Sequence, residues 1–170
     1  MYPPTNNPFN YKRFQTFLAL ISIFILLSSF YFQYVKHLEP CPLCLMQRLS
    51  VFCLALISLC AIFLKRFKVI KSVAILQIIF ASAGLFFASR QLWLQFLPAG
   101  QTAACMPELD VLLQYFPWSD IAHAFFWGSS NCAEHTWQWL GLPMPGWSLA
   151  YFALMLLANI RLLFIKRVSL

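Results

Sequence analysis

Four long apolar stretches dominate the sequence and restrict the chain to a membrane-spanning fold. They cover about residues 14–35, 43–64, 70–89 and 145–165. A helix of about 20 residues, rising about 1.5 Å per residue, crosses the roughly 30 Å hydrocarbon core of a bilayer. Of the 170 residues, 61% are hydrophobic and only 10% are charged, which excludes a soluble domain of this size. We therefore predict an all-α membrane protein, a four-transmembrane-helix bundle forming a single membrane domain.

The basic residues predict how this bundle is oriented. They gather before the first stretch, between the second and third, and after the fourth (Lys12, Arg13, Lys65, Arg66, Lys68, Lys71, Arg161, Lys166 and Arg167). By the positive-inside rule these segments face the cytoplasm. Residues 1–13 then form a cytoplasmic tail, both termini are cytoplasmic, and the loops 36–42 and 90–144 lie outside. The net charge of +7 is explained by this topology, because no interleaved aromatic and basic surface for nucleic acid is present.

A C-x-x-C motif begins the second stretch, in the segment PCPLCLMQR at residues 40–48. Proline suits the first turn of a helix, so Cys44 falls where unpaired amides and the helix dipole stabilise a thiolate. Arg48 follows four residues later on the same helical face. An isolated C-x-x-C also fits a structural disulfide or half of a zinc site. A buried arginine favours redox chemistry, since it is costly in lipid unless an anionic or strongly polar group uses it.

Two further cysteines, Cys105 and Cys132, lie in the long outer loop. On the oxidising side of a membrane we expect them to pair, either as a structural staple or as an exchangeable disulfide. Zinc binding is disfavoured because this pair lacks the close spacing of metal ligands, and no C-x-x-C-H haem signature is present. The loop is rich in aromatic residues, which predicts a short interfacial helix with Ser119-Asp120 as its cap.

Several other residues near these cysteines have two interpretations. Arg90 and Gln91 end the third stretch at the level of the C-x-x-C, and Arg90 is either an interfacial anchor or part of the redox site. For His37 the two interpretations are a place among the lipid headgroups, which we favour, and a proton donor beside the redox pair. Cys53 and Cys60 lie on one face of the second helix, and we interpret both as packing residues.

This combination resembles the DsbB family, the membrane quinone reductases of bacterial disulfide formation. The likeness is strongest in three segments, CPLCLMQR at 41–48, ASRQLWLQ at 88–95 and CAEHTWQWLGLPMPGW at 132–147. It implies a multi-pass protein of the bacterial inner membrane, with periplasmic outer loops. It also implies a periplasmic partner, a thioredoxin-fold dithiol oxidase of the DsbA type.

The resemblance further implies the roles of individual residues. A thiolate of the partner would attack Cys105, and electrons would pass from the Cys105/Cys132 pair to Cys41/Cys44. Cys44 would donate to ubiquinone or menaquinone, with Arg48 polarising a carbonyl oxygen. Gln47, Arg90 and Gln91 are the remaining candidate quinone contacts. In the neighbourhood of Arg90 and Gln91, the best-known member of the family has a histidine.

Two alternatives to this function remain. A reductase of the vitamin K epoxide reductase type also couples cysteine pairs to quinones, but its C-x-x-C tends to come late in the chain, whereas here it begins the second helix. A tetraspan scaffold with a stapled outer loop would share the topology without being an enzyme. Such a scaffold would have no use for Cys41 and Cys44 beside Arg48.

Overall fold

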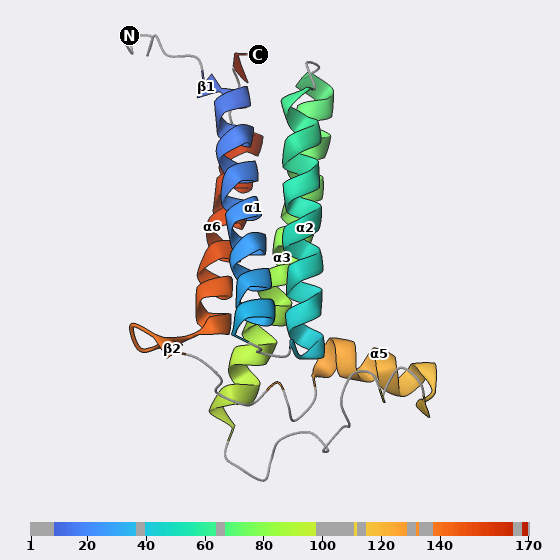
Figure 1. The fold of residues 1–170 in the computed structure, drawn as a ribbon. Helices are drawn as coiled ribbons and strands as arrows, with labels where there is room; N and C mark the ends of the chain where they lie inside the picture. Colours follow the sequence, from blue (N-terminus) through green and yellow to red (C-terminus); the bar gives the residue numbers. More distant parts are fainter. Residues whose placement is uncertain are drawn as a thin grey trace.

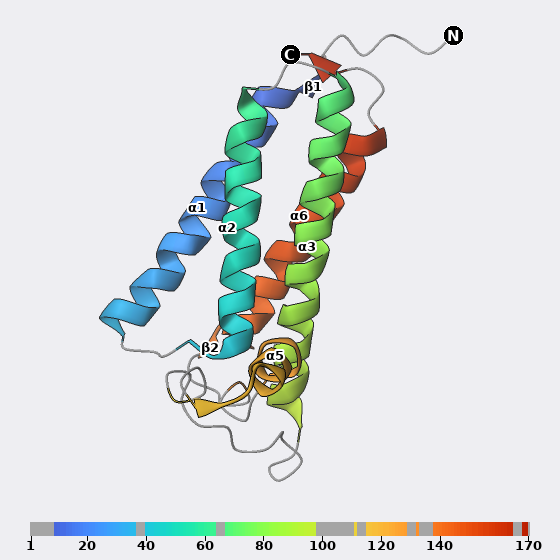
Figure 2. The ribbon, with the colours of Figure 1, turned by 90° about the vertical axis from the view of Figure 1, so that its right-hand side faces the viewer.

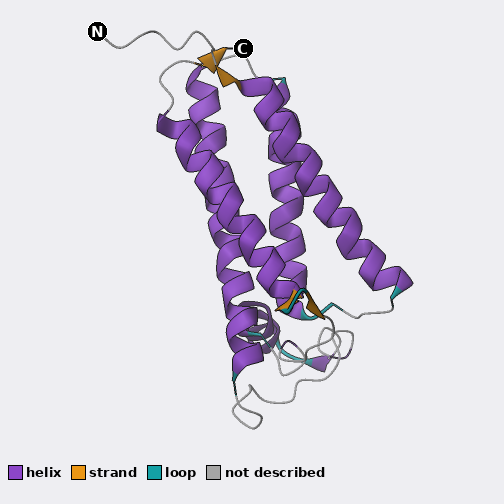
Figure 3. Ribbon diagram, turned by 90° about the vertical axis from the view of Figure 1, so that its left-hand side faces the viewer, coloured by secondary structure: helices purple, strands orange, loops and turns teal. Residues whose placement is uncertain are grey.

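Four long helices make up most of the structure, a computed structural model. They are α1 (Tyr11–Val35), α2 (Pro42–Ile62), α3 (Phe67–Phe96) and α6 (Met144–Phe164), and together they form one elongated bundle (Figures 1 and 3). All four are long and apolar enough to cross a membrane. The predicted four-helix membrane bundle is therefore confirmed. The structure describes residues 9–36, 40–63, 67–97, 111, 115–128, 132, 138–164 and 168–169.

Each long helix packs against the next one along the chain. Helix α2 lies between α1 and α3, and α3 packs along α6. Large apolar side chains outside the core stay exposed, as expected for surfaces that face lipid. Gly84 of α3 permits a close contact between α3 and α6, because a Cβ atom there would lie 2.1 Å from Cε1 of Phe152 on α6. In Figure 2, α1 diverges from the other helices toward the end of the bundle that carries α5.

The two described ends of the chain meet at the opposite end of the bundle. Strand β1 (Phe9–Asn10) pairs in parallel with β4 (Val168–Ser169), beside the start of α1 and beyond the end of α6. We call this the terminal end and the other the α5 end. The hairpin of β2 (Gln138–Trp139) and β3 (Leu142–Pro143) precedes α6 at the α5 end (Figure 1). The first and last described residues of the chain thus lie together at the terminal end of the bundle.

A layer of buried polar side chains crosses the half of the bundle nearest the terminal end. We call Gln15, Ser58, Gln77 and Asn159 the inner polar layer, with one residue from each long helix. All four are almost completely buried. Nε2 of Gln77 donates to Oε1 of Gln15 at 3.0 Å and to Oγ of Ser58 at 2.9 Å. Gly84 of α3 lies against Phe152 of α6, and these two helices run antiparallel. Gln77 and Asn159 are each seven residues from that contact, so they lie at the same level of the bundle.

The predicted end of the third helix was wrong. Helix α3 extends to Phe96 instead of ending near residue 89, so Arg90 and Gln91 lie inside a helix. The charge at Arg90 does not interrupt it, because the next helix-breaking residue in the sequence is Pro98.

The short helix α5 (Trp118–Trp127) was predicted, but Ser119-Asp120, the cap predicted for it, is not the cap. The N-cap is Pro117, in an extended conformation, and its carbonyl accepts from the amide of Asp120 at 3.0 Å. Ser119 and Asp120 therefore lie within the first turn. Figure 1 shows α5 lying across the axis of the bundle. The side chains of Trp118, Phe126 and Trp127 on this helix are exposed.

Candidate redox site

The C-x-x-C occupies the start of α2, as the sequence predicts. Cys41 is the N-cap in an extended conformation and Pro42 is the first helical residue, which brings Cys44 into the first turn. The two sulfur atoms lie 3.2 Å apart, at hydrogen-bond distance. Cys41 is buried, whereas Cys44 lies partly open at the wall of a cavity. The two cysteines therefore face different surroundings despite their close spacing.

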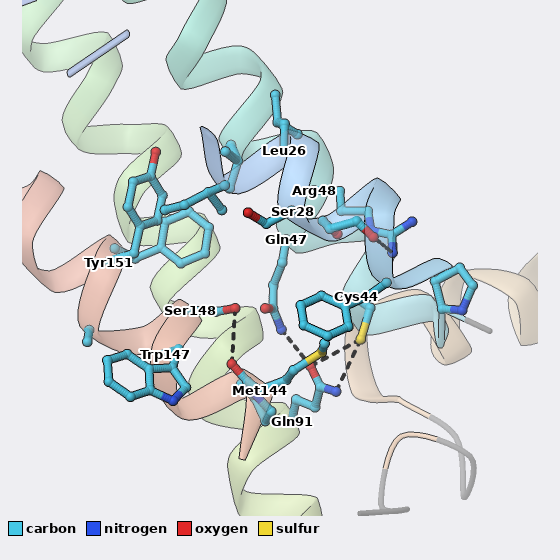
Figure 4. A pocket seen from close by; sticks show the side chains of 18 of the residues that line it. Leu26, Ser28, Cys44, Gln47, Arg48, Gln91, Met144, Trp147, Ser148 and Tyr151 are labelled. Atoms are coloured by element: carbon cyan, nitrogen blue, oxygen red, sulfur yellow. Dashed lines mark hydrogen bonds between the residues drawn. The ribbon is translucent and has the colours of Figure 1, made fainter. Parts of the chain in front are cut away.

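Two buried glutamines connect Cys44 to the third helix. Nε2 of Gln91, on α3, lies 3.2 Å from Sγ of Cys44. Oε1 of Gln91 accepts a hydrogen bond of 2.7 Å from Nε2 of Gln47, on α2. Each glutamine is only 6% exposed. Figure 4 shows both amides and the sulfur at one end of the cavity.

Arg48 is held in place by the first helix. Its guanidinium donates to Oε1 of Gln33 and, at 3.2 Å, to the backbone carbonyl of Ser29. It also lies over the ring of Phe30, 5.7 Å from the centroid. These contacts leave the cation in the same cavity wall as Cys44, as the spacing of four residues predicts.

The cavity has a volume of about 550 Å³ and lies between the diverging α1 and the start of α6. Its α5 end is polar, with Cys44, Gln47, Arg48 and Gln91 in the wall. Apolar side chains of α1 and α6 line much of the rest, including Phe24 and Ile25 of α1 and Leu154 and Phe152 of α6. A flat, mostly apolar ligand would thus meet the sulfur, the amides and the cation at one end only.

Cys132 packs beside the C-x-x-C. It is almost completely buried in an apolar cluster with Cys41, Leu43, Phe87 and Leu94. Hydrogen bonding with the thiol of Cys132, then with that of Cys44, and then burial raise the pKa of Cys41 well above its ordinary value. A loop cysteine and the helix cysteine are therefore in contact. Cys105 lies outside the described residues, and so does its predicted bond to Cys132.

Arg90 lies away from the cavity. Its Nε donates to the carbonyl of Trp127 at 3.2 Å, and its guanidinium lies over the ring of that residue, 5.4 Å from the centroid. Arg90 thus ties α3 to the end of α5. Gly128, which follows Trp127, has a φ of 83° and packs against Leu43 and Leu94. A Cβ atom at this position would lie 2.7 Å from either side chain.

The sequence did not single out several residues of the site. Gln33 holds Arg48, and Met144, Trp147 and Tyr151 of α6 line the cavity. Met144 and Trp147 lie in a segment that resembles the DsbB family, which is a signal that could have been followed. No comparable signal marks Gln33, because its role depends on how α1 packs against α2.

Comparisons with known proteins agree with this geometry. The sequence model of the family described as "Disulfide bond formation protein DsbB" matches residues 11–162. The chain belongs to the DsbB family. Disulfide bond formation protein B of Marinobacter nauticus is 40% identical over 143 residues, which are 83% of this chain and 84% of that protein.

Two other relatives cover similar or larger parts of the chain. The protein of the same description from Hahella chejuensis is 42% identical over 138 residues, 80% of this chain and 84% of its own. That from Acinetobacter baumannii is 37% identical over 163 residues, 91% and 92% of the two chains. As a DsbB-family protein with four apolar helices, the chain is a multi-pass membrane oxidoreductase of disulfide bond formation.

Proposed function

We propose that this DsbB-family protein reoxidises a periplasmic thioredoxin-fold dithiol oxidase of the DsbA type and passes the electrons to a membrane quinone. The observation that carries the proposal is the position of the two sulfurs of the C-x-x-C. Cys44 lies in the wall of a large apolar cavity, whereas Cys41 contacts the loop cysteine Cys132. One sulfur is thus available to a lipid-soluble oxidant and the other to the thiols of the loop.

The residues of the cavity fit a quinone. A quinone has a flat ring with two carbonyl acceptors and a long apolar tail, and the cavity combines donors at one end with apolar walls along its length. Arg48, Gln47 and Gln91 would hold the ring, and α1 and α6 would hold the tail. When bound, ubiquinone or menaquinone supplies the acceptor for two electrons. Arg48 favours the negative charge that develops on a carbonyl oxygen. Arg90 is left out of this set because it contacts Trp127.

The first half of the reaction takes place at the loop pair. The partner's thiolate attacks Sγ of Cys105, which breaks the Cys105–Cys132 bond and releases Cys132 as a thiolate. The partner's second thiol then loses its proton and attacks the mixed disulfide, which releases Cys105 and leaves the partner oxidised. The loop pair has now accepted the two electrons.

The second half transfers these electrons to the C-x-x-C. The Cys132 thiolate attacks Sγ of Cys41, breaks the Cys41–Cys44 bond and releases Cys44 as a thiolate. The contact between Cys132 and Cys41 supports this choice of sulfur. The Cys105 thiolate then attacks Cys132, re-forms the loop disulfide and frees Cys41. The N–H of Gln91 and the amides of the first turn stabilise the Cys44 thiolate, which faces the cavity where the quinone would bind.

The route requires the α5 end to face the periplasm. We therefore propose that the protein lies in the bacterial inner membrane with both termini in the cytoplasm. The pairing of β1 with β4 and the basic residues around the terminal end support this orientation. Labelling of Cys41 and Cys105 by a membrane-impermeant reagent from the periplasmic side would agree with it. Labelling of the two residues from opposite sides would rule the route out.

Quinol formation by the purified chain tests the function directly. With reduced DsbA-type partner and either short-chain ubiquinone or menaquinone, the unmutated protein should form quinol, followed by its absorbance. Cys44→Ser should abolish turnover because it removes the sulfur that faces the cavity. Cys60→Ser, an exposed cysteine of α2, serves as the matched control and should retain activity. Activity in Cys44→Ser would refute the role of Cys44, and inactivity of the unmutated chain with both quinones would favour a scaffold.

A further inference from the structure

The amide of Gln91 has both of its ends occupied. Its oxygen accepts from Nε2 of Gln47 at 2.7 Å, and its nitrogen lies 3.2 Å from Sγ of Cys44. The oxygen also accepts from the thiol of Cys44, at the longer distance of 3.5 Å. Both glutamines are almost fully buried, so water competes little for these contacts. The side chains form a continuous series from α2 to α3 and back to α2 (Figure 4).

The direction of this amide decides what it does to the sulfur. A side-chain amide has one donating end and one accepting end, and a thiolate only accepts hydrogen bonds. With the nitrogen toward Cys44, the amide stabilises the thiolate; with the oxygen toward Cys44, it favours the protonated thiol and repels the anion. Gln47 donates to the oxygen and so keeps the nitrogen on the side of the sulfur.

We propose that Gln47 is a positioning residue that orients the amide of Gln91 to donate to the Cys44 thiolate. This rests on the proposed function, in which Cys44 is the thiolate released at each turnover. Gln47 acts through Gln91 and not by contact with the sulfur. Without the Gln47 donor, the Gln91 amide rotates and presents its oxygen to Cys44 in part of the molecules. The fraction of Cys44 present as the reactive anion then falls.

Alkylation of Cys44 in the reduced full-length protein measures this fraction without quinone or partner. A short exposure to iodoacetamide at neutral pH is followed by peptide mass spectrometry, with the labelling of Cys44 normalised to that of Cys60. Gln47→Met keeps an unbranched side chain of similar length and removes the donor. Since hydrogen bonds to charged groups are the strong ones, we expect Cys44 to be labelled about tenfold more slowly in this variant. Gln47→Leu provides a second variant with the same expectation.

A double-mutant cycle separates positioning from a general structural effect. Gln91→Met should slow labelling of Cys44 at least as much as Gln47→Met, and adding Gln47→Met to it should change nothing further. Ser50→Ala is the matched control, because Ser50 is a buried polar residue of α2 that donates to the carbonyl of Met46 in its own helix. This control should label at the unmutated rate.

The inference would be overturned by normal labelling in Gln47→Met, or by an equal slowing in the presence and absence of Gln91. Because labelling needs neither quinone nor partner, its result is independent of the turnover assay. If the cycle behaves as expected but the unmutated protein forms no quinol, the proposed function is wrong and the orienting role of Gln47 stands. If quinol forms but the cycle shows no coupling, only the role of Gln47 is wrong.

Discussion

Buried glutamines occur in two regions of the bundle, and the two regions use them differently. In the inner polar layer, Gln15 and Gln77 donate to each other at 3.4 and 3.0 Å, and Gln77 also donates to Ser58. In the cavity wall, Gln47 donates to Gln91, whose other end faces the sulfur of Cys44. The hydrogen bonds among Gln15, Gln77 and Ser58 are closed upon themselves, whereas those of the cavity wall end at the sulfur of Cys44.

We therefore expect the inner polar layer to contribute to the stability of the bundle and the polar end of the cavity to contribute to the reaction. A polar side chain in lipid is costly unless another protein group satisfies it, so the inner polar layer holds α1, α2 and α3 together. The polar end of the cavity contains a cation as well, and a cation at this depth is more costly still. Residues that only held helices together would not need Arg48. The comparison therefore predicts that changes in the two regions affect different measurements.

The largest effect is expected from removal of the cation. Arg48→Met preserves the length of the side chain but removes the charge that, in the proposed function, stabilises developing negative charge in the cavity. Loss of one such donor typically costs about 100-fold in turnover, and we expect a decrease of that order in quinol formation. The thermal unfolding of the purified protein should change much less. Arg161→Met, in the last turn of α6, is the control and should leave turnover unaltered. Near-normal turnover in Arg48→Met would place the essential charge elsewhere.

The opposite result is expected in the inner polar layer. Gln77→Leu removes the hydrogen bonds to Gln15 and Ser58 and leaves both with unsatisfied polar groups in an apolar surrounding. We expect a loss of about 1 kcal/mol in the free energy of unfolding, measured in detergent, with turnover unchanged at temperatures where the protein stays folded. Ile79→Leu, at an exposed position of α3, is the control. A loss of turnover without a loss of stability would show that the two regions are coupled.

The sequence was sufficient for the parts of this arrangement that lie within one helix. The four long apolar stretches predicted the bundle, and the spacing of four residues placed Cys44 and Arg48 in one cavity wall. Both predictions depend only on helix geometry and on the thickness of a bilayer. The C-x-x-C was likewise expected at the start of a helix because prolines flank it.

Contacts between helices could not be predicted in the same way. Each long helix is apolar on nearly all sides, so no amphipathic pattern shows which face meets a neighbour. The support of Arg48 by Gln33, and the pairing of Gln15 with Gln77, depend on the register of separate helices. The contact between Cys132 and Cys41 depends on the path of the loop, which the sequence does not specify.

The smallest effect concerns Cys41, at the border between the cavity and the loop. Hydrogen bonding with Cys132, above all, raises the pKa of this thiol above the ordinary value of 9.0. A raised pKa keeps the thiol protonated, so Cys41 has almost no thiolate at neutral pH and gains it only under alkaline conditions. In the reduced protein, the midpoint of Cys41 alkylation against pH should lie above 9.0 and should move down in Cys132→Ala. The alkylation rate at high pH, where the thiol is fully ionised, reports how easily the reagent reaches Cys41. The midpoint of the pH curve therefore measures ionisation alone, whatever the access to the site. Cys53→Ala removes a thiol farther along α2 and should leave the midpoint in place. A midpoint that does not move in Cys132→Ala would mean that the two sulfurs are not in contact in the reduced protein, and Cys132 would then lose its place as the thiolate that attacks Cys41.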